Sequence, residues 1–441
     1  MKMEFIIDPA GIPAQITKKI TVPGDKSISH RALMIGSLAR GTSYFSNCLV
    51  SEDVMATCRM LEHLGVKIES SGDQFQVIGR GLASFTEPST VLDLGNSGTT
   101  TRLGMGLIVP SRIFAVLTGD ASLRRRPMDR VIIPLSLLGA RFQARQENTL
   151  PPVAILPSGP LKPAEYQGIV PSAQVKSAFL LAALQIPGTS IYHEPVPTRD
   201  HTERMLQAAG ADLTVLGSTI SVTGGKPLNP LIMEIPGDPS AAAFWVVAGL
   251  LVPEAEFHIL NVGVNPRRTG FIRVLERMGG NVHLTNLRTQ GGEEVCDLIV
   301  KSSELRGCVV SAAEIPDLID EVPILAVAAA FAKGTTVFEG VGELRYKESD
   351  RVESIVTQFG GLGVQASARE DVLEITGGDR VSPGVIDSLH DHRIAMAGAI
   401  LALRAAGPVK ITGGESIYTS YPDFIEQFKR LFGPESVQEL P

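Results

Sequence analysis

The feature that most constrains the fold is an internal repeat that covers almost the whole chain. At six places a short polar cluster opens a run rich in alanine and leucine. The six segments read GDKSISHRALMIGSLARGT from Gly24, GNSGTTTRLGMGLIV from Gly95, PSAQVKSAFLLAALQIPGT from Pro171, GDPSAAAFWVVAGLLVP from Gly237, IDEVPILAVAAAFAKGT from Ile319 and HDHRIAMAGAILALRAAG from His390. Corresponding positions lie 66 to 81 residues apart. Because recurrence at a nearly fixed spacing indicates repeated structural units, we expect six related units.

A second pattern recurs between these segments. It reads as a helix that ends at glycine, followed by two alternating strands around a turn, as in LQAAGADLTVLGSTISVTG and FGGLGVQASAREDVLEITG. A glycine that stops a helix and alternation of apolar residues are signals for this order of elements. Each unit is therefore predicted to contain mixed α and β structure, and six such units make two domains of three.

Proline and glycine interrupt the pattern near residues 21–23 and 235–237 and mark the domain boundaries. We predict one domain over 23–236, with repeats one to three, and another over 1–22 plus 237–433, with repeats four to six. The strand at Phe5 to Ile7 then joins the C-terminal half, so the chain crosses twice at one hinge. Residues 434–441 look like a frayed tail.

Composition narrows the possible functions. The formal net charge is −7 and aromatic residues make up 5% of the chain, which argues against nucleic acid and anionic membranes as partners. Charges at Lys2, Glu4 and Asp8 leave no room for the apolar core of a signal peptide, and the longest uncharged apolar run is too short to span a bilayer. Four cysteines without a C-x-x-C pair suit a reducing compartment. We expect a cytoplasmic monomer.

The six predicted helix N-termini carry different polar side chains on one apolar framework. Free N–H groups and the helix dipole make such ends favourable for anions. In the first segment, Lys26 and His30 are four residues apart, as are Ser27 and Arg31, so each pair shares a helical face. Taken alone, this stretch fits a helix capped by Ser27 as well as it fits a binding site.

Other polar clusters also have two interpretations when each is taken alone. Asp320 is either a helix cap or a base beside a substrate. Arg126, in a segment with four arginines in nine residues, either lies on a solvated face or clamps an anion. Glu348 and Arg351 are three residues apart, as in a surface ion-pair ladder. Together with the basic groups, Asp320 and Glu348 favour proton-transfer chemistry on small, multiply anionic substrates bound between two domains. The His390–His392 pair lacks further ligands, so neither a metal nor a redox cofactor is expected.

The segments that carry these residues resemble, in order, those of the EPSP synthases, the enolpyruvyl transferases of the shikimate pathway. The matching segments are GDKSISHRAL, LGNSGTTTRL, RRRPMDRV, SAQVKSAFLLAAL, TRDHTERML, GDPSAAAF, the Asp320 segment with AVAAAFAKGTT, KESDRV and DHRIAMA. The forms SAQVKSA, TRDHTERML and KESDR are similar to the bacterial class II branch. The resemblance implies an α/β (α+β) fold, a two-domain inside-out α/β barrel built from six βαβαββ repeats, three in each domain.

The resemblance also implies the reaction and its residues. The 5-hydroxyl of shikimate 3-phosphate adds to C2 of phosphoenolpyruvate, and phosphate is then eliminated without a cofactor. Asp320 is implied as the base for the hydroxyl proton, with Glu348 and Lys26 acting at the methylene and phosphate side. The positions implied to face shikimate 3-phosphate are Lys26, Ser27, Arg31, Ser172, Ala173, Gln174, Arg199, Asp320 and Lys347. Those implied to face phosphoenolpyruvate are Lys26, Gly98, Arg126, Gln174, Arg351 and Arg393.

Two positions bear on the phosphoenolpyruvate site. Many family members carry lysine before the aromatic-Pro-Asp near the C-terminus, whereas this chain has Thr419 and Ser420, and Lys347 is the alternative source of that charge. Gly98 stands where glyphosate-tolerant relatives carry alanine. We therefore predict that glyphosate, which mimics phosphoenolpyruvate, inhibits the protein.

Two other functions stay open at this point. The transferase that adds enolpyruvate to UDP-N-acetylglucosamine shares the repeats and the donor, but it opens with Lys-Asn where this chain has Lys26-Ser27, and it usually bears a loop cysteine near the SLRRRP segment, which has none here. The other alternative is a non-catalytic anion-binding protein on the same repeats. Such a protein has little reason to keep both Asp320 and Glu348 beside arginines.

Overall fold

The structure is a computed structural model that describes residues 3–13 and 15–440, and it divides into two compact units. Unit 1 comprises Met1–Pro23, Pro236–Arg288 and Glu294–Pro441. Unit 2 comprises Gly24–Ile235 and Thr289–Glu293. The short segment 289–293, placed in the C-terminal domain by the sequence, is therefore grouped with unit 2.

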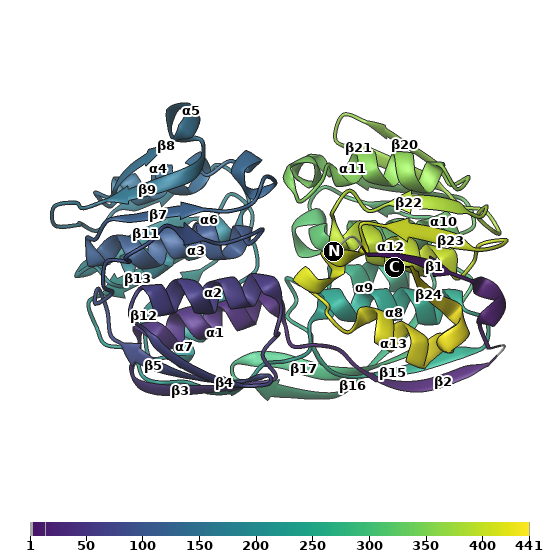
Figure 1. Cartoon of the computed structure of the whole chain (residues 1–441), viewed down its shortest axis with the longest axis horizontal. Helices are drawn as coiled ribbons and strands as arrows, with labels where there is room; N and C mark the ends of the chain where they lie inside the picture. The colour runs from purple at the N-terminus through teal and green to yellow at the C-terminus, as the bar shows by residue number, and fades with distance from the viewer. Residues whose placement is uncertain (1–2, 14, 441) are drawn as a thin grey trace. The chain divides into compact units, whose positions relative to one another are not determined.

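Unit 2 contains three four-stranded sheets with the same strand order. Figure 1 labels many of their strands and the helices packed against them. In each sheet an edge strand runs parallel to the second strand, which pairs antiparallel with the third, and the third pairs antiparallel with the fourth. In that order the sheets are β14 (Ile232–Glu234), β3 (Arg40–Ser46), β5 (Gln74–Arg80), β4 (Lys67–Ser71); β6 (Leu92–Asp93), β7 (Ala115–Thr118), β9 (Leu150–Leu156), β8 (Arg141–Ala144); and β10 (Glu165–Gln167), β11 (Gly188–His193), β13 (Thr219–Gly224), β12 (Asp212–Leu216).

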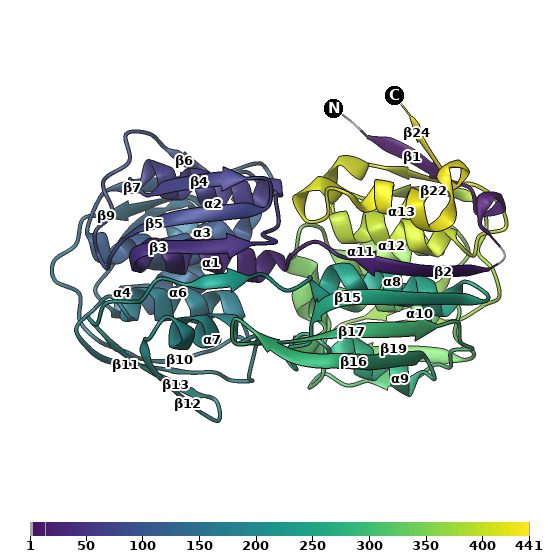
Figure 2. The same ribbon diagram turned by 90° about the horizontal axis from the view of Figure 1, so that it is seen from below.

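Unit 1 repeats this order three more times. Its sheets are β2 (Ile16–Thr21), β15 (Ala255–Gly263), β17 (Glu293–Lys301), β16 (Asn281–Gln290); β18 (Val309–Val310), β19 (Thr335–Glu339), β21 (Val372–Thr376), β20 (Gln365–Arg369); and β22 (Gly384–Asp387), β23 (Val409–Thr412), β1 (Glu4–Ile7), β24 (Val437–Leu440). The two ends of the chain supply the last two strands and lie side by side (Figure 2). β1 thus joins the C-terminal half as predicted.

The predicted tail at 434–441 is wrong for residues 434–440. A 3₁₀-helix at Pro434–Ser436 leads into β24, which pairs with all four residues of β1. Every other repeat completes its sheet with a local hairpin, but the sixth has no such partner nearby in sequence. The C-terminal residues therefore become ordered by filling the open edge of that sheet.

The six repeated apolar segments form helices inside the units, and we call these the inner helices. They are α1 (Lys26–Leu38), α3 (Gly98–Ile108) and α6 (Ala173–Ala183) in unit 2, and α8 (Pro239–Leu251), α10 (Val322–Ala330) and α12 (His392–Ala402) in unit 1. α3 packs against α1 and α6, and in unit 1 each inner helix packs against the other two. Every residue of α8 and α10 is buried, as expected for helices that are apolar on all faces. With helices inside and sheets around them, the predicted inside-out α/β fold of six repeats is confirmed.

The remaining helices lie between the repeated elements. They are α2 (Glu52–His63), α4 (Asp129–Leu137), α5 (Arg145–Asn148), α7 (His201–Ala208), α9 (Gly270–Arg277), α11 (Arg351–Ser354), which continues as a π-helix over Ile355–Phe359, and α13 (Phe424–Phe432). Further 3₁₀-helices span Pro9–Gly11, Val109–Ser111, Leu123–Arg125, Ile315–Asp317, Ile319–Glu321, Gly342–Tyr346 and Gly414–Thr419. In residues 3–13 and 15–440, no helix has both the length and the apolar character needed to cross a membrane.

Side-chain caps define five of the six inner-helix N-termini. The capping residues are Asp25, Ser97, Ser172, Asp238 and Asp391. Asp25, rather than Ser27, caps α1, and its Oδ1 accepts a hydrogen bond from the backbone N–H of Ile28 at 2.9 Å. Ser27 lies within the first turn of the helix and is therefore available for other contacts.

Candidate active site

In unit 2, the N-terminal end of α1 is fixed to α6 and α7 through one buried arginine. Arg31 donates from Nε to Thr202 Oγ1 at 2.7 Å, from Nη2 to Ser177 Oγ at 2.9 Å and from Nη1 to the Ser27 carbonyl at 2.9 Å. Ser177 and Thr202 are also hydrogen-bonded to each other, at 2.6 Å. The guanidinium is therefore held rigidly beside the first turns of α1 and α6.

A chain of side chains joins α1 to α3. His30 Nδ1 lies 2.7 Å from Thr57 Oγ1, which lies 2.7 Å from Thr100 Oγ1, and Thr100 in turn lies 2.7 Å from Ser97 Oγ. Burial, together with the charges of Lys26 and Arg31, lowers the pKa of His30 well below its usual value. His30, which had no predicted role, is therefore a neutral linker between two helix N-termini.

The third connection in unit 2 runs between α3 and α6. Arg102 Nη1 donates to Gln174 Oε1 at 2.6 Å, and Gln174 Nε2 donates to Thr99 Oγ1 at 3.0 Å. Gln174 lies in the first turn of α6, so its amide is oriented by two residues of α3.

Arg126 reaches the N-terminal end of α3 from the loop between the 3₁₀-helix Leu123–Arg125 and α4. Its Nη2 donates to Asn96 Oδ1 at 2.6 Å and its Nη1 to the Asn96 carbonyl at 3.3 Å. It is buried, whereas Arg124 and Arg125 in the same run are exposed, so the run is not one solvated face. A Cβ added to Gly98 would lie 3.0 Å from Arg126 Nη1, which shows how closely the backbone of α3 approaches this guanidinium.

Unit 2 thus gathers most of its predicted site residues at one set of helix N-termini. Lys26 forms an ion pair with Asp53 at 3.3 Å, and Ser172 caps α6 directly before Ala173. Arg199 is half-buried and lies two residues before the first residue of α7.

In unit 1, two carboxylates that are far apart in sequence meet on one guanidinium. Arg351 Nη1 donates to Asp320 Oδ1 at 3.2 Å, and its Nη2 donates to Glu348 Oε2 at 2.6 Å. Its Nε donates to Asp391 Oδ2 at 2.8 Å, and Lys347 Nζ lies 3.1 Å from Asp320 Oδ1. Arg351 is only 1% exposed, so it is not part of a surface ion-pair ladder.

The charges around Arg351 determine its protonation. Burial alone would lower the pKa of Arg351, but the three carboxylates Asp391, Glu348 and Asp320 outweigh that effect and raise the pKa above its usual value. The guanidinium therefore stays charged and holds the two predicted acid–base groups in a fixed arrangement.

Arg393 connects the inner helices of unit 1. Its Nη1 donates to the Asp320 carbonyl at 2.8 Å and lies 3.4 Å from Glu321 Oε1, which also accepts a hydrogen bond from Ser240 Oγ. Arg268 Nη2 donates to that serine hydroxyl at 2.9 Å. Asp320 makes no side-chain cap contact with α10, because in the described chain the residue at the N-cap position is Glu321 and no side chain caps this helix.

Sequence reasoning missed several residues of this network. Glu321, Asp391 and Ser240 belong to the repeated N-terminal segments, so the repeat alignment contained a signal for them. Arg268 lies outside every repeated segment, and only the tertiary structure brings it to Ser240.

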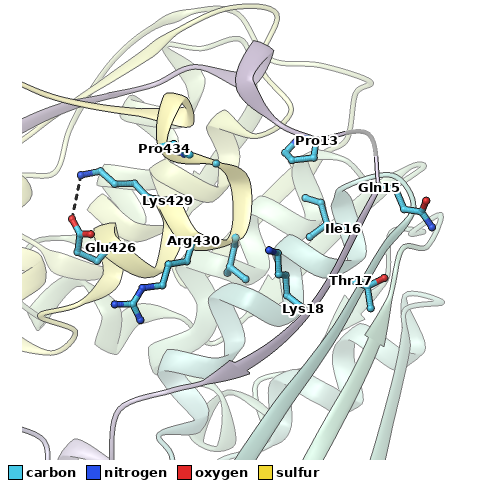
Figure 3. Close-up of a pocket in the computed structure, with 11 residues that line it drawn as sticks. Pro13, Gln15, Ile16, Thr17, Lys18, Glu426, Lys429, Arg430 and Pro434 are labelled. Atoms are coloured by element: carbon cyan, nitrogen blue, oxygen red, sulfur yellow. Dashed lines mark hydrogen bonds and ion pairs between the residues drawn. The ribbon is translucent and has the colours of Figure 1, made fainter.

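A separate groove in unit 1 lies between β2 and α13 (Figure 3) and has a volume of about 740 Å³. Pro13, Ile16, Lys18, Arg430 and Pro434 are among the residues that line it. None of the predicted site residues lines this groove, so it has no part in the site built from the inner helices.

Comparison with known proteins identifies the family. The sequence profile of EPSP synthase (3-phosphoshikimate 1-carboxyvinyltransferase) matches residues 11–428. The chain belongs to the EPSP synthase family. Within this family, it is 48% identical over 432 residues to the 3-phosphoshikimate 1-carboxyvinyltransferase of Synechococcus elongatus, covering 97% of this chain and 96% of that protein. The protein of the same name from Desulforamulus reducens is 43% identical over 430 residues, covering 97% and 99% of the two chains.

Solved structures of EPSP synthases agree with this assignment. The EPSP synthase from Acinetobacter baumannii superposes with a TM-score of 0.87 at 39% identity, and all of both chains is covered. The enolpyruvyl transferase NikO from Streptomyces tendae has a TM-score of 0.79 at 16% identity, covering 100% of this chain and 98% of that one, and shares the fold. The family resemblance read from the ordered motifs is thus confirmed. Among the described residues of this family member, no group of three or more His, Cys, Asp or Glu side chains is arranged to hold a metal ion.

Proposed function

We propose that the protein transfers the enolpyruvyl group of phosphoenolpyruvate to the 5-hydroxyl of shikimate 3-phosphate, giving 5-enolpyruvylshikimate 3-phosphate and phosphate. The observation that carries the proposal is the shared contact of Asp320 and Glu348 with Arg351. A reaction that removes one proton and delivers another needs two such groups near each other. Membership of the EPSP synthase family supports the same reaction.

The proposed chemistry has two steps. In the first step, the 5-oxygen forms a bond to C2 of phosphoenolpyruvate while Asp320 takes the hydroxyl proton. At the same time C3 receives a proton, and Glu348 and Lys26 are the groups proposed to act at that methylene carbon and at the phosphate. In the second, C3 loses a proton, the bond from C2 to the phosphate oxygen breaks, and the double bond re-forms. Positioned acid–base groups typically contribute ~10²–10⁴-fold each, and fixed cations stabilise the charge that develops on the phosphate.

The predicted substrate contacts remain part of this proposal. Ser27, Arg31, Ser172, Ala173, Gln174, Arg199, Lys347 and Lys26 face shikimate 3-phosphate together with Asp320. Gly98, Arg126, Gln174, Arg351, Arg393 and Lys26 face phosphoenolpyruvate. The hydrogen bonds that orient Arg31, Gln174 and Arg126 support the assignment, because preorganised donors need no rearrangement when an anion binds.

Further expectations belong to the same proposal. We propose that units 1 and 2 are the two domains, that the reaction needs the residues of both, and that neither a metal nor an organic cofactor takes part. We also propose that the protein works as a cytoplasmic monomer without a nucleic-acid partner.

The direct test measures phosphate release from phosphoenolpyruvate, with shikimate 3-phosphate and UDP-N-acetylglucosamine as alternative acceptors. We expect turnover with shikimate 3-phosphate only. Turnover with the sugar nucleotide alone would replace this function with that of the related transferase.

Asp320→Asn tests the proposed base while preserving the size of the side chain. We expect kcat to fall by ~10²–10⁴-fold, measured as phosphate release, with an unfolding midpoint close to that of the wild type. Exposed Asp379 is a matched control, because Asp379→Asn changes the same functional group away from the site and should leave kcat unchanged. An Asp320→Asn enzyme with wild-type turnover would contradict the proposed role.

A further inference from the structure

Lys176 is a fully buried lysine on α6 that the proposed chemistry does not use. Its Nζ lies 2.6 Å from Glu203 Oε1 on α7 and 3.0 Å from Glu194 Oε1, which follows β11. The exposed fraction of Lys176 is 0%. Burial of an ammonium group costs free energy unless it is paired, and replacing a buried ion pair with apolar groups is often neutral or stabilising. Stability alone therefore gives little reason for a charged cluster at this position.

The cluster fixes one residue of the segment between β11 and α7. Lys176 Nζ donates to the Thr198 carbonyl at 3.4 Å. Glu194 Oε1 accepts a hydrogen bond from the Thr198 backbone N–H at 3.1 Å and another from the Thr198 hydroxyl. Three hydrogen bonds thus hold Thr198, and the next residue is Arg199.

The position of Lys176 on α6 links the Thr198 contact to the proposed substrate residues at the N-terminal end of that helix. Lys176 is two residues after Gln174 and four after Ser172, so the ammonium that holds Thr198 is carried by the same helix end as those two residues. A side chain on one element thereby sets the position of a residue on another. Ser172, Gln174 and Arg199 are all proposed to face shikimate 3-phosphate.

The charges in the cluster are unequal. One ammonium, on α6, faces two carboxylates, one on α7 and one after β11. Burial raises the pKa of Glu203, although Lys176 opposes that rise. Two tyrosines also lie near the carboxylates. Burial raises the pKa of Tyr192 on β11 and that of Tyr166 on β10, and Tyr166 and the two carboxylates raise that of Tyr192 further, so both hydroxyls stay neutral. Loss of the ammonium would leave two carboxylates facing each other without a cation.

We propose that Lys176 is a positioning residue for the binding of shikimate 3-phosphate. By holding Thr198, Lys176 fixes the position of the neighbouring Arg199 relative to the N-terminal end of α6. This inference rests on the proposed function of Arg199. A buried methionine would fill nearly the same volume as Lys176, but it could not donate the hydrogen bonds that the ammonium group makes.

The first test replaces Lys176 with methionine, which keeps an unbranched side chain of similar volume, one atom shorter, and removes the charge. We expect KM for shikimate 3-phosphate to rise about tenfold to hundredfold, as for the loss of one charge-assisted hydrogen bond. KM for phosphoenolpyruvate and kcat at saturating acceptor should change by less than about threefold. Lowering the pH should partly restore KM for shikimate 3-phosphate in this variant, because protonation of one carboxylate relieves the repulsion. A merely structural role predicts neither the difference between the two KM values nor the pH effect.

A double-mutant cycle with Arg199→Ala separates this inference from its premise. If Lys176 acts through Arg199, Lys176→Met should have little further effect on KM for shikimate 3-phosphate in the Arg199→Ala background. An unchanged KM in Arg199→Ala alone would refute the proposed role of Arg199 and, with it, this inference. A raised KM in Arg199→Ala combined with an unchanged KM in Lys176→Met, or with fully additive effects, would refute the role of Lys176 only.

Thr198→Val keeps the test decisive if Lys176→Met does not fold. Valine has the shape of threonine but lacks the hydroxyl that donates to Glu194. We expect a smaller rise, about threefold to tenfold, in KM for shikimate 3-phosphate and no change in KM for phosphoenolpyruvate. Equal rises in both KM values would contradict the inference.

Discussion

Single buried cations hold most of the candidate site in place. Arg351 contacts Asp320, Glu348 and Asp391, and Arg31 contacts a serine, a threonine and a backbone carbonyl. A guanidinium presents five donors in a fixed plane, so it can orient several groups at once where an ammonium acts more as a point charge. Arg393 and Arg126 also contact more than one group each, so we expect lysine to be a poor substitute at these positions.

Gly98 sets the space available next to Arg126. In Gly98→Ala the new methyl group would lie 3.0 Å from Arg126 Nη1, so the guanidinium must move away. Overpacking of this kind costs ~1–3 kcal/mol, which corresponds to about fivefold to 150-fold in a binding constant. We expect the inhibition constant for glyphosate to rise by that factor in the variant, measured against the wild type in the phosphate-release assay.

Gly378→Ala is the matched control for that change. A Cβ at Gly378 meets no atom within 4 Å, and this residue has no predicted role in the site. Its inhibition constant should equal that of the wild type. Weak and equal inhibition of the wild type and Gly98→Ala would show that glyphosate does not depend on this space.

His30 makes stability depend on pH. Its pKa in the folded protein is well below the unfolded value of about 6.5, so below pH 6.5 the unfolded chain binds the extra proton. The free energy that neutral, buried His30 contributes to folding is fully present above pH 6.5. Below that pH it is lost by about 1.4 kcal/mol per pH unit. We expect His30→Gln to lose less free energy of unfolding than the wild type between pH 7.5 and 5.5, measured by urea denaturation. Equal losses would mean that folding does not lower the pKa of His30.

At the scale of elements, each unit joins the N-terminal ends of its three inner helices through side chains. Unit 2 uses the connections through Arg31, His30 and Gln174, and unit 1 uses those through Arg393 and Ser240. The apolar bodies of these helices pack by shape, but the polar contacts at one end specify which side chains are neighbours. The capping residues act at the same place because they fix where each helix begins.

Asp25 tests the contribution of one such cap. Asp25→Ala removes the acceptor for the Ile28 backbone N–H and should lower the free energy of unfolding by ~0.5–2 kcal/mol. Asp25→Asn retains a capping oxygen and should lower the free energy of unfolding by only a few tenths of a kcal/mol. Urea denaturation of both variants measures the difference, and equal losses would show that the charge rather than the cap stabilises α1.

At the scale of the whole molecule, the repeat is closed by joining the two ends of the chain. β1 comes from the N-terminus and β24 from the C-terminus, yet together they occupy the two positions that a hairpin fills in the other sheets. An unpaired edge of β1 would expose its backbone groups, and β24 covers them.

Deletion of residues 434–441 tests this closure. The variant loses the pairing of β24 with β1 and the buried side chain of Val437, so we expect a free energy of unfolding lower by at least ~2 kcal/mol. Gln438→Ala, which changes only a side chain that points away from the core, should leave stability unchanged. Because the proposed catalytic residues lie in other elements, turnover at low temperature should persist. An unchanged unfolding midpoint would mean that the strand adds nothing to the sheet.

Much of the fold could be predicted from local patterns. The repeated apolar segments, the helix-stop glycines and the alternating strands are features of neighbouring residues, so they indicate elements without knowledge of the tertiary structure. The capping residue of α1 was harder, because Asp25 and Ser27 are both good caps and only the backbone geometry distinguishes them. The ordered tail could not be foreseen, because its partner strand lies at the other end of the chain.

The sequence by itself determined the six repeats, the inside-out fold, the family and the residues proposed for the enolpyruvyl transfer. Short motifs and their order along the chain are enough to indicate all of these. The tertiary structure alone decided the partners of those residues: Arg351 with Asp391, Lys176 with Glu203, and Arg268 with Ser240. Such pairs join positions far apart along the chain, and their contacts exist only once the inner helices have packed. Charge pairing depends on distance in space, which motif and spacing do not specify.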